Sequence, residues 1–405
     1  MSDPNEDQEE KNTDGMEGES GAETIHVSGI RSIRDLIDRV TGRNLDDLSL
    51  GDAGYAEQWP FPFFAVVGQQ EMKLGLILTL INPNIGGVLL VGPRGTGKTT
   101  SVRSLMDLMP YVYESNCYYG CLEEDVETGG LESLCPACAE KYQKGEPLSS
   151  LRPAKLVELP LNAKMEDVLG SVDEKAAASN RLRVRRGILS HADKNILYID
   201  EVNLLKDEVV DVILDASAQG SYTVRRGQFA ATYRSRFTLV GTMNPEEGTL
   251  RPQILDRFGL RLMVEGLEDT EERLSAYKLA RAYMTNPKRV VEMYADETMI
   301  ARDEIAAARK LIPEVDLPEE IAKIGLDLIR ELEIASLRAE ITLFEAARAM
   351  AAADGRTVVE EDDLRQVATM ALRLRRSKFI EDYFTDQEGE EVEIDKKLEK
   401  IMGGK

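Results

Sequence analysis

The sequence predicts an α/β fold in which a parallel five-stranded sheet is flanked by helices and is followed by an all-helical domain. Three observations lead to this prediction. A glycine-rich loop joins an apolar strand to a helix within residues 88–109. Further apolar runs alternate with helical stretches up to residue 266, which is typical of a parallel sheet with helices on both faces. After Gly266 the apolar residues recur only at helical spacing.

Both ends of the sequence are acidic. The 405 residues carry a formal net charge of −23. Residues 1–25 hold nine acidic residues against one lysine, and residues 381–405 hold nine against four lysines. We predict a disordered acidic tail at 1–28, which is poor in apolar residues, and a second acidic tail at 381–405. The body between them is acidic as well, which disfavours nucleic acid as a partner because a polyphosphate would be repelled.

We expect neither a membrane span nor an export signal. No run of about 18 uncharged apolar residues occurs, which excludes a membrane-spanning helix. The N-terminus lacks the basic and apolar regions of a signal peptide and is too acidic for a transit peptide. We therefore expect a cytoplasmic protein.

Residues 29–58 are predicted to hold a helix and a linker. One amphipathic helix that packs on another element is predicted by Ile30, Ile33, Leu36, Ile37 and Val40. The stretch Trp59-Pro60-Phe61-Pro62-Phe63-Phe64 follows. Its aromatic side chains are typical either of core packing or of a wall around a nucleotide base.

The glycine-rich loop predicts a phosphate-binding site. It reads Gly92-Pro93-Arg94-Gly95-Thr96-Gly97-Lys98-Thr99 and follows the apolar run Val88–Val91. Its glycines allow backbone N–H groups to curl around an anion, Lys98 can reach the β- and γ-phosphates, and Thr99 offers a hydroxyl to Mg²⁺. A helix follows the loop, with Val102, Leu105, Met106 and Met109 on one face and Pro110 ending it. We infer that this loop, with the adjoining Thr100, binds a nucleoside triphosphate.

All four cysteines fall within 22 residues, as a C-x₃-C pair and a C-x₂-C pair. They are Cys117, Cys121, Cys135 and Cys138. Two thiolates of a close pair can meet one ion, and two pairs complete a tetrahedral site of four sulfurs, which favours structural Zn²⁺. An iron–sulfur or redox role and four unligated thiols are the alternatives. The sequence has only two histidines, so we expect no histidine-based metal site.

Four apolar runs after the loop predict the remaining strands: Lys155–Leu159, Ile196–Ile199, Phe237–Gly241 and Leu260–Val264. Asp200 and Glu201 end the second of these runs. Ligands bind at the carboxyl ends of the strands in parallel sheets, so both acids are expected to face the triphosphate. Asp200 would hold Mg²⁺, and Glu201 would activate the attacking water.

Two further polar residues follow the acids along the chain. Asn244 either orients the attacking water or serves as a turn residue ahead of Pro245. Arg257 either stabilises the charge on the departing γ-phosphoryl group or forms an ion pair with a neighbour such as Asp256. Their order and spacing after Asp200 favour the catalytic interpretation.

The domain boundaries follow from this pattern. Residues 59–266 are predicted to form an ATP-binding α/β domain that carries a four-cysteine insertion at 117–138. Residues 267–380 are predicted to form a helical lid domain. Its helices are indicated by Ile321, Ile324, Leu328 and Leu332, by Leu343–Ala353, and by Leu364, Val367, Ala368, Ala371 and Leu372.

The order of these motifs resembles the AAA+ family of P-loop NTPases, and several phrases are similar to the ATPase subunit I of magnesium chelatase. The similarity runs from about residue 60 to residue 375. The phrases are Phe61-Pro62-Phe63, Val67-Gly68-Gln69, Tyr198–Leu205, Asn244-Pro245-Glu246-Glu247-Gly248, Leu250–Gln253, Leu255–Leu260 and Leu337-Arg338-Ala339-Glu340. The four cysteines and the acidic tails are departures from the better known members, so the resemblance gives them no role.

The resemblance implies a role for each site residue. A ring, expected to be a hexamer, would hold ATP and Mg²⁺ between subunits. Lys98, Thr99, Asp200, Glu201 and Asn244 would act within one subunit. Arg257 would enter the neighbour's site as an arginine finger, with Arg251 as a weaker candidate, and Arg338 would act as a second sensor of the γ-phosphate. Val67 and Gly68 would lie against adenine.

The resemblance also implies partners. The ring would work on an adaptor subunit with an integrin-like domain and, with a porphyrin-binding catalytic subunit, insert Mg²⁺ into protoporphyrin IX. Insertions at 170–190 and at Tyr222–Tyr233, with a turn at Arg225-Arg226-Gly227, would contact the partner or form ordinary surface hairpins.

Three other functions stay open on sequence alone. The first is a MoxR-like or cobalt-chelatase-like remodelling ATPase with another client. The second is a DNA-translocating motor, which the acidic body disfavours. The third is an ATP-gated scaffold, which the retention of both Glu201 and Arg257 disfavours.

Overall fold

The computed structural model describes residues 59–117, 120–172, 184–226, 229–248 and 250–375. The chain divides into the units Met1–Gln58 and Trp59–Lys405, and all described residues belong to the second unit. The predicted tails at 1–28 and 381–405 and the predicted helix in 29–58 lie outside the described residues.

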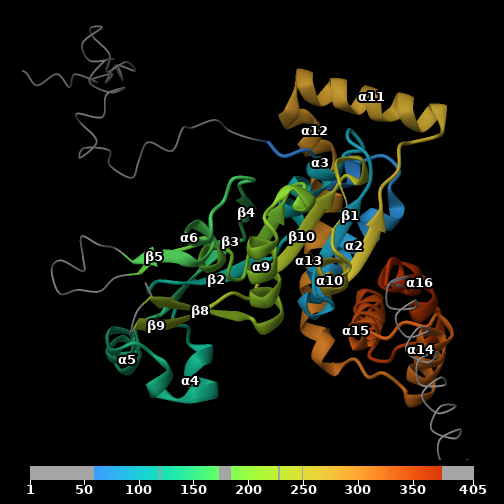
Figure 1. Cartoon of the computed structure of the whole chain (residues 1–405). Coiled ribbons are helices and arrows are strands. Elements are labelled where there is room, and N and C mark those ends of the chain that lie inside the picture. The colour runs from blue at the N-terminus through green and yellow to red at the C-terminus, as the bar shows by residue number, and fades with distance from the viewer. Residues whose placement is uncertain (1–58, 118–119, 173–183, 227–228, 249, 376–405) are drawn as a thin grey trace, which may run out of the picture. The chain divides into compact units, whose positions relative to one another are not determined.

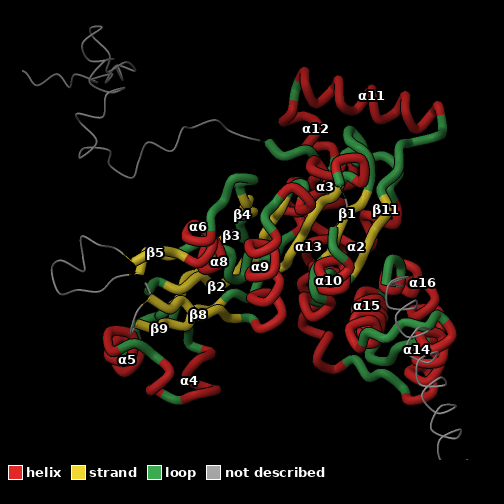
Figure 2. The backbone as a smooth tube through the Cα atoms, in the orientation of Figure 1, coloured by secondary structure: helices red, strands yellow, loops and turns green. Residues whose placement is uncertain are grey.

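A five-stranded sheet runs through this unit (Figure 2). Its strands lie in the order β11–β1–β10–β7–β4, and every neighbouring pair is parallel. The strands are β1 (Val88–Val91), β4 (Leu156–Leu159), β7 (Ile196–Ile199), β10 (Thr238–Met243) and β11 (Leu260–Met263). The prediction of a parallel five-stranded sheet is confirmed.

Both faces of the sheet are buried. Val88 and Leu90 of β1 belong to one hydrophobic cluster, whereas Leu89 and Val91 belong to another. Successive side chains of a strand point to opposite faces, so the two clusters lie on the two sides of the sheet. Every residue of β1, β7 and β10 is buried for this reason. The carboxyl ends of these three strands meet at one edge.

Helices flank the sheet (Figure 1). They are α2 (Gln70–Ile81), α3 (Lys98–Ser104), α6 (Met165–Leu169), α8 (Ile188–His191), α9 (Asp207–Gln219) and α10 (Pro252–Arg257). The 3₁₀ turns are Phe63–Ala65, Pro83–Ile85, Leu105–Leu108, Leu131–Ser133, Val202–Leu204, Pro245–Glu247 and Ile312–Glu314. The sequence predicts a helix from the loop to Met109, but α3 ends at Ser104 and the chain continues as a 3₁₀ turn.

The region after Gly266 is helical, as predicted. Its helices are α11 (Thr270–Thr285), α12 (Pro287–Met293), α13 (Ala295–Leu311), α14 (Glu319–Glu331), α15 (Leu337–Ala353) and α16 (Glu361–Leu372). α13 packs on the α/β part, because Arg302 donates to the carbonyl oxygen of Asp107 and Arg309 to that of Leu80. Buried residues of α13, α15 and α16 share the hydrophobic cluster that contains Leu90.

Three antiparallel pairs project from the main sheet as separate two-stranded units. They are β2 (Tyr111–Ser115) with β3 (Ser149–Pro153), β5 (Gly170–Val172) with β6 (Val184–Arg186), and β8 (Ser221–Arg226) with β9 (Phe229–Arg234). The helices α4 (Glu124–Gly129) and α5 (Pro136–Gln143) lie between β2 and β3 in the chain. The insertions predicted at 170–190 and Tyr222–Tyr233 therefore contain strand pairs. Among the described helices, none is long and apolar enough to span a membrane.

Candidate functional site

The glycine-rich loop joins β1 to α3, as predicted. Gly95 and Gly97 have φ values of 80° and 86°, which side-chain-bearing residues rarely adopt. A Cβ atom on either residue would have no other atom within 4 Å, so the loop faces open space there. A Cβ on Gly92 would lie 2.0 Å from the carbonyl oxygen of Val264, so only glycine fits at that position.

Lys98 is the first residue of α3 and folds over the loop. Its Nζ donates to the carbonyl oxygens of Gly92 at 2.7 Å and Pro93 at 2.6 Å. Burial lowers the pKa of Lys98, while the charges of Asp200 and Glu201 act in the opposite direction. The ammonium group therefore lies close enough to both acids for their charges to act on it.

Asp200 follows β7 and is held by two hydroxyl groups. Its Oδ1 accepts hydrogen bonds from Tyr198 at 2.8 Å and from Thr242 at 2.6 Å. Burial raises the pKa of Tyr198, so its hydroxyl stays protonated and can donate. The same hydroxyl lies 3.2 Å from Oγ1 of Thr99. The two predicted magnesium ligands, Thr99 and Asp200, are thus brought together around one side chain.

Glu201 lies in a strained backbone conformation. Its φ of 51° belongs to the left-handed region, which is uncommon for a residue with a side chain and is frequent at functional sites. Its backbone N–H donates to Oγ1 of Thr242 at 2.9 Å. One carboxylate oxygen lies 3.6 Å from Nη2 of Arg94, which also pairs with Glu247.

Asn244 follows β10 and is almost fully buried. Its Oδ1 accepts a hydrogen bond from the backbone of Glu246 at 3.2 Å, so it does cap the turn that starts at Pro245. It also lines the same cavity as the acids. The turn interpretation and the catalytic interpretation therefore both fit this residue.

One cavity of about 320 Å³ collects most of the predicted residues, and we call it the phosphate cavity. It is lined by Arg94, Gly95, Thr96, Gly97, Lys98, Thr99, Thr100, Asp200, Glu201, Thr242 and Asn244. Its two ends are the glycine-rich loop and the carboxyl ends of β7 and β10. The sequence missed Thr242 here, and it missed the contribution of Tyr198 to holding Asp200.

A second cavity of about 460 Å³ shares Gly95, Thr96, Gly97 and Thr100 with the first, and we call it the base cavity. Phe61 and Val67 line it, whereas Phe63 is fully buried in the hydrophobic core. Part of the aromatic stretch thus packs in the core and part of it lines a cavity, which keeps both interpretations of the stretch open. Gly68 neighbours Leu267, which also lines the cavity. Arg273 of α11 lines it as well, and the sequence did not indicate this residue.

Arg257 and Arg338 line neither cavity. Arg257 ends α10 and pairs with two acids of α9, Asp215 at 2.9 Å and Asp211 at 3.3 Å, rather than with Asp256. Arg338 lies 3.6 Å from Asp256, at the start of α15. The structure therefore places both arginines around α10, away from Lys98 of the same chain.

The four cysteines form a separate cluster. Their Sγ atoms all lie within 4.8 Å of one another, and none of them lines the phosphate cavity or the base cavity.

Comparisons with known proteins agree with this geometry. Residues 166–269 match the family described as magnesium chelatase, subunit ChlI, and residues 326–397 match the AAA lid domain. The chain is 43% identical to the magnesium-chelatase subunit ChlI homolog of Methanocaldococcus jannaschii, over 80% of this chain and 87% of that protein.

The chain belongs to the magnesium-chelatase subunit I family of AAA+ ATPases.

Other members of the family are similarly related. The magnesium-chelatase 38 kDa subunit of Chlorobaculum parvum is 39% identical, over 85% of this chain and 98% of that protein. A solved complex between subunits BchI and BchD of magnesium chelatase contains a chain that is 37% identical, with a TM-score of 0.45, over 80% of this chain and 99% of that one. The identities to the two curated relatives confirm the resemblance inferred from the motifs, and with it the prediction of an ATPase.

Proposed function

We propose that this chain is the ATP-hydrolysing motor subunit of a magnesium chelatase. With two partner subunits it would drive the insertion of Mg²⁺ into protoporphyrin IX, in the synthesis of chlorophyll or bacteriochlorophyll. The observation that supports this most is the gathering of Lys98, Asp200 and Glu201 at one cavity, in a chain 43% identical to a magnesium-chelatase subunit ChlI homolog.

The two cavities fit a magnesium-bound nucleoside triphosphate. Thr99 and Asp200 offer a hydroxyl and a carboxylate, which are ligands that Mg²⁺ prefers in proteins. The ion, when bound, neutralises charge on the phosphates. Lys98 would exchange its bonds to the loop carbonyls for contacts to the β- and γ-phosphates. The base would lie in the base cavity, against Val67 and Gly68.

Glu201 is proposed as the base that activates the attacking water. It stands at the carboxyl end of β7, and Asn244 follows the neighbouring strand β10. Both side chains line the phosphate cavity, so one water molecule between them could be oriented toward the γ-phosphate. Arg94, 3.6 Å from Glu201, would shift toward the phosphates when they bind.

Arg257 is proposed to act on the ATP of an adjoining subunit. Hydrolysis needs positive charge near the departing γ-phosphoryl group, and an arginine finger can supply it. Arg257 lies outside the phosphate cavity of its own chain, which supports a role in the cavity of another. Arg338 would be a second sensor at the same junction, since it lies next to Asp256. Each hydrolytic site would then need two chains of a ring, for which we propose six subunits.

The porphyrin is proposed to bind to another subunit. The sequence of this chain holds only two histidines. It therefore offers few imidazole ligands for a site that would insert Mg²⁺ into a porphyrin. The motor would pass its movement to an adaptor subunit with an integrin-like domain, and a third subunit would carry the porphyrin.

A reconstitution assay tests the proposed function. The chain is mixed with the other two subunits of a magnesium chelatase, ATP, Mg²⁺ and protoporphyrin IX, and the fluorescence of the magnesium porphyrin is recorded. We expect insertion that requires both the chain and ATP. ATP hydrolysis without insertion would show that this motor serves another client, and hydrolysis that is stimulated by DNA would point to a translocating motor.

A substitution in the same assay tests the role of Glu201. Glu201→Gln removes the base but keeps the shape of the side chain, so the variant should bind ATP and support neither hydrolysis nor insertion. The matched control is Glu208→Gln, an exposed residue of α9, which should behave like the unchanged chain. Hydrolysis by Glu201→Gln at the unchanged rate would contradict the assignment.

A further inference from the structure

The four cysteines surround one point. Their Sγ atoms lie within 4.8 Å of one another, and those of Cys117 and Cys135 are 3.7 Å apart. Tetrahedral Zn²⁺ with Zn–S bonds of about 2.3 Å requires sulfur atoms about 3.8 Å apart. The distance between Cys117 and Cys135 matches this value, and the upper bound of 4.8 Å on the others leaves only small side-chain shifts to complete the site. No disulfide joins the four residues. Two of the sulfurs come from the loop before α4, and the other two come from the start of α5.

The backbone around the sulfurs brings two cysteines together at the start of a helix. Cys135 is the N-cap of α5, and Pro136 is its first residue. The N–H of Cys138 donates to the carbonyl oxygen of Cys135 at 2.9 Å, which turns the second thiol back toward the first. The N–H of Cys135 lies 3.3 Å from Sγ of Cys121, where it would stabilise a thiolate.

The described residues of 116–148, which we call the cysteine module, have only a small hydrophobic cluster of their own. Its hydrophobic cluster has four buried members, of which two are Cys121 and Cys138 and two are Leu134 and Leu148. Segments of this size seldom bury enough apolar surface to fold, and a structural metal is a common remedy. A bound ion would supply stability that this small hydrophobic cluster does not provide.

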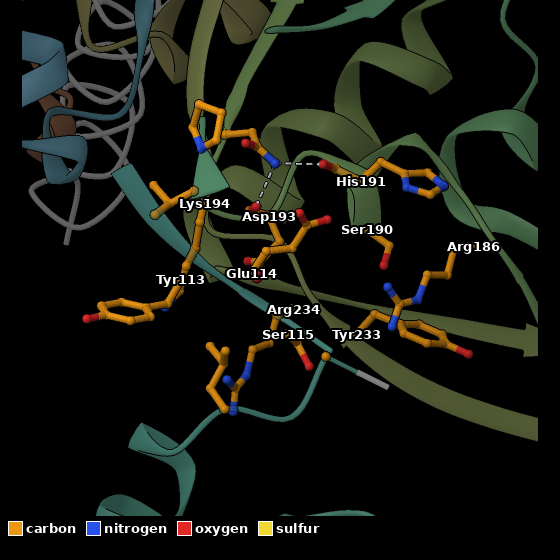
Figure 3. Close-up of a pocket in the computed structure, with 15 residues that line it drawn as sticks. Tyr113, Glu114, Ser115, Arg186, Ser190, His191, Asp193, Lys194, Tyr233 and Arg234 are labelled. Atoms are coloured by element: carbon orange, nitrogen blue, oxygen red, sulfur yellow. Dashed lines mark hydrogen bonds between the residues drawn. The ribbon is translucent and has the colours of Figure 1, made fainter. Parts of the chain in front are cut away.

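The module anchors the neighbouring strand pairs. Arg186 of β6 donates to the carbonyl oxygen of Cys117 at 2.8 Å, so one strand pair is attached to a cysteine itself. Arg234 of β9 forms an ion pair with Asp125 of α4. Lys194 pairs with Glu124 at 3.2 Å. Figure 3 shows Arg186 and Arg234 at a cavity of about 60 Å³ that the module, α8 and β9 share.

We propose that Cys117, Cys121, Cys135 and Cys138 bind one structural Zn²⁺ and that this ion holds the β5–β6 and β8–β9 strand pairs in place. Four thiolates in tetrahedral order suit Zn²⁺, and the absence of carboxylate or imidazole from the set disfavours the harder divalent cations. The proposal does not depend on the ATP site. Its consequence is that a metal helps to position the two insertions, in addition to the packing of Tyr222, Val224 and Tyr233 against the core on one face of the parallel sheet.

Metal content tests the first half of the proposal. The full chain is purified without chelators, and its metals are measured by mass spectrometry. We expect one zinc per chain, and four thiols that resist alkylation until zinc is extracted. Cys138→Ser should lower the zinc content at least tenfold. The control Ser133→Ala, which removes a hydroxyl bonded only to carbonyl oxygens of the module, should keep one zinc. Iron in place of zinc, or four readily alkylated thiols in protein without metal, would overturn the proposal.

Hydrogen exchange tests the second half, with no need for a cysteine variant to fold. Zinc is extracted from the full chain with a chelator, and exchange is compared with that of untreated protein. We expect backbone exchange in 184–186 and 229–234 to rise at least tenfold and to return when zinc is added back. Exchange in β1 and α3, and binding of ATP, should stay unchanged. Unchanged exchange in both strand pairs would overturn the anchoring role.

Discussion

The hydroxyl groups of Tyr198 on β7 and Thr242 on β10 position the two acids of the phosphate cavity. Tyr198 and Thr242 donate to the same oxygen of Asp200, and Thr242 also accepts a hydrogen bond from the backbone of Glu201. The second bond holds Glu201 at a φ of 51°, a conformation that costs a non-glycine residue about 1 kcal/mol or more. Thr242 is therefore a positioning residue for both acids.

Replacing Thr242 by valine tests this role. Valine keeps the shape but loses both hydrogen bonds, so kcat for ATP hydrolysis should fall about 10–100-fold and the Mg²⁺ concentration at half-maximal rate should rise. Thr242→Ser, which keeps the hydroxyl, should restore most of the rate. The control is Thr238→Val, because Thr238 is equally buried on the same strand. An unchanged Mg²⁺ dependence in Thr242→Val would contradict a role in holding Asp200.

Site residues that belong to contiguous motifs could be predicted, and those that act through a neighbouring strand could not. Lys98 and Glu201 were found because a loop or a strand end displays them in one stretch of sequence. Tyr198 lies two residues before Asp200 in the chain, but the sequence alone did not show that its hydroxyl would hold the carboxylate. Thr242 contacts Asp200 only because β7 lies beside β10, and neither segment shows by itself that the two strands are neighbours. The same reasoning applies to Arg257, whose acidic partners lie on α9 and not next to it in the chain.

The helix α10, which ends at Arg257, is connected to the C-terminal helices through one carboxylate. Asp256 lies 2.9 Å from Arg375 and 3.9 Å from Arg261, and neither arginine side chain is exposed to solvent. The other oxygen of Asp256 accepts a hydrogen bond from Ser336 at 2.8 Å and lies 3.6 Å from Arg338. A movement of the C-terminal helices would thus reach Arg257, the next residue along α10.

Asp256→Asn should destabilise the protein. The substitution removes the charge that compensates two buried guanidinium groups, so the free energy of unfolding in urea should fall by about 3 kcal/mol. The control is Asp327→Asn, because Asp327 forms an exposed pair with Arg330, and such pairs contribute less than about 1 kcal/mol. Equal effects of the two substitutions, measured by circular dichroism, would show that the Asp256 network does not stabilise the fold.

Elements with a buried face could be predicted more readily than exposed ones. β1 and β7 are continuous apolar runs because both of their faces are covered. β2 was missed, because Tyr111 and Tyr113 are more than half exposed and the strand has no apolar run. The spacing of the four cysteines predicted one cluster of sulfur atoms, and their Sγ atoms do lie within 4.8 Å of one another. The prediction was possible because two close pairs of cysteines can bind one ion regardless of how the chain runs between the pairs.

At the scale of the whole molecule, we propose that the hydrolytic site is shared between adjoining chains. The phosphate cavity holds the loop, Asp200, Glu201 and Asn244, but it contains no arginine besides Arg94 among its lining residues. Arg257 faces Asp211 and Asp215 on α9 instead. We therefore expect Arg257 of one chain to act on the ATP of the next.

Mixing two inactive variants tests this claim most directly. Glu201→Gln keeps Arg257 but lacks the base, whereas Arg257→Ala keeps the base but lacks the finger and should lose about 10³-fold in kcat while still binding ATP. In rings formed from an equal mixture, a site whose own chain has Glu201 and whose neighbour has Arg257 is complete. We predict that the mixture recovers ATP hydrolysis at about a quarter of the sites, if the subunits assemble at random around head-to-tail interfaces. A mixture that stays as inactive as its two components would contradict the account.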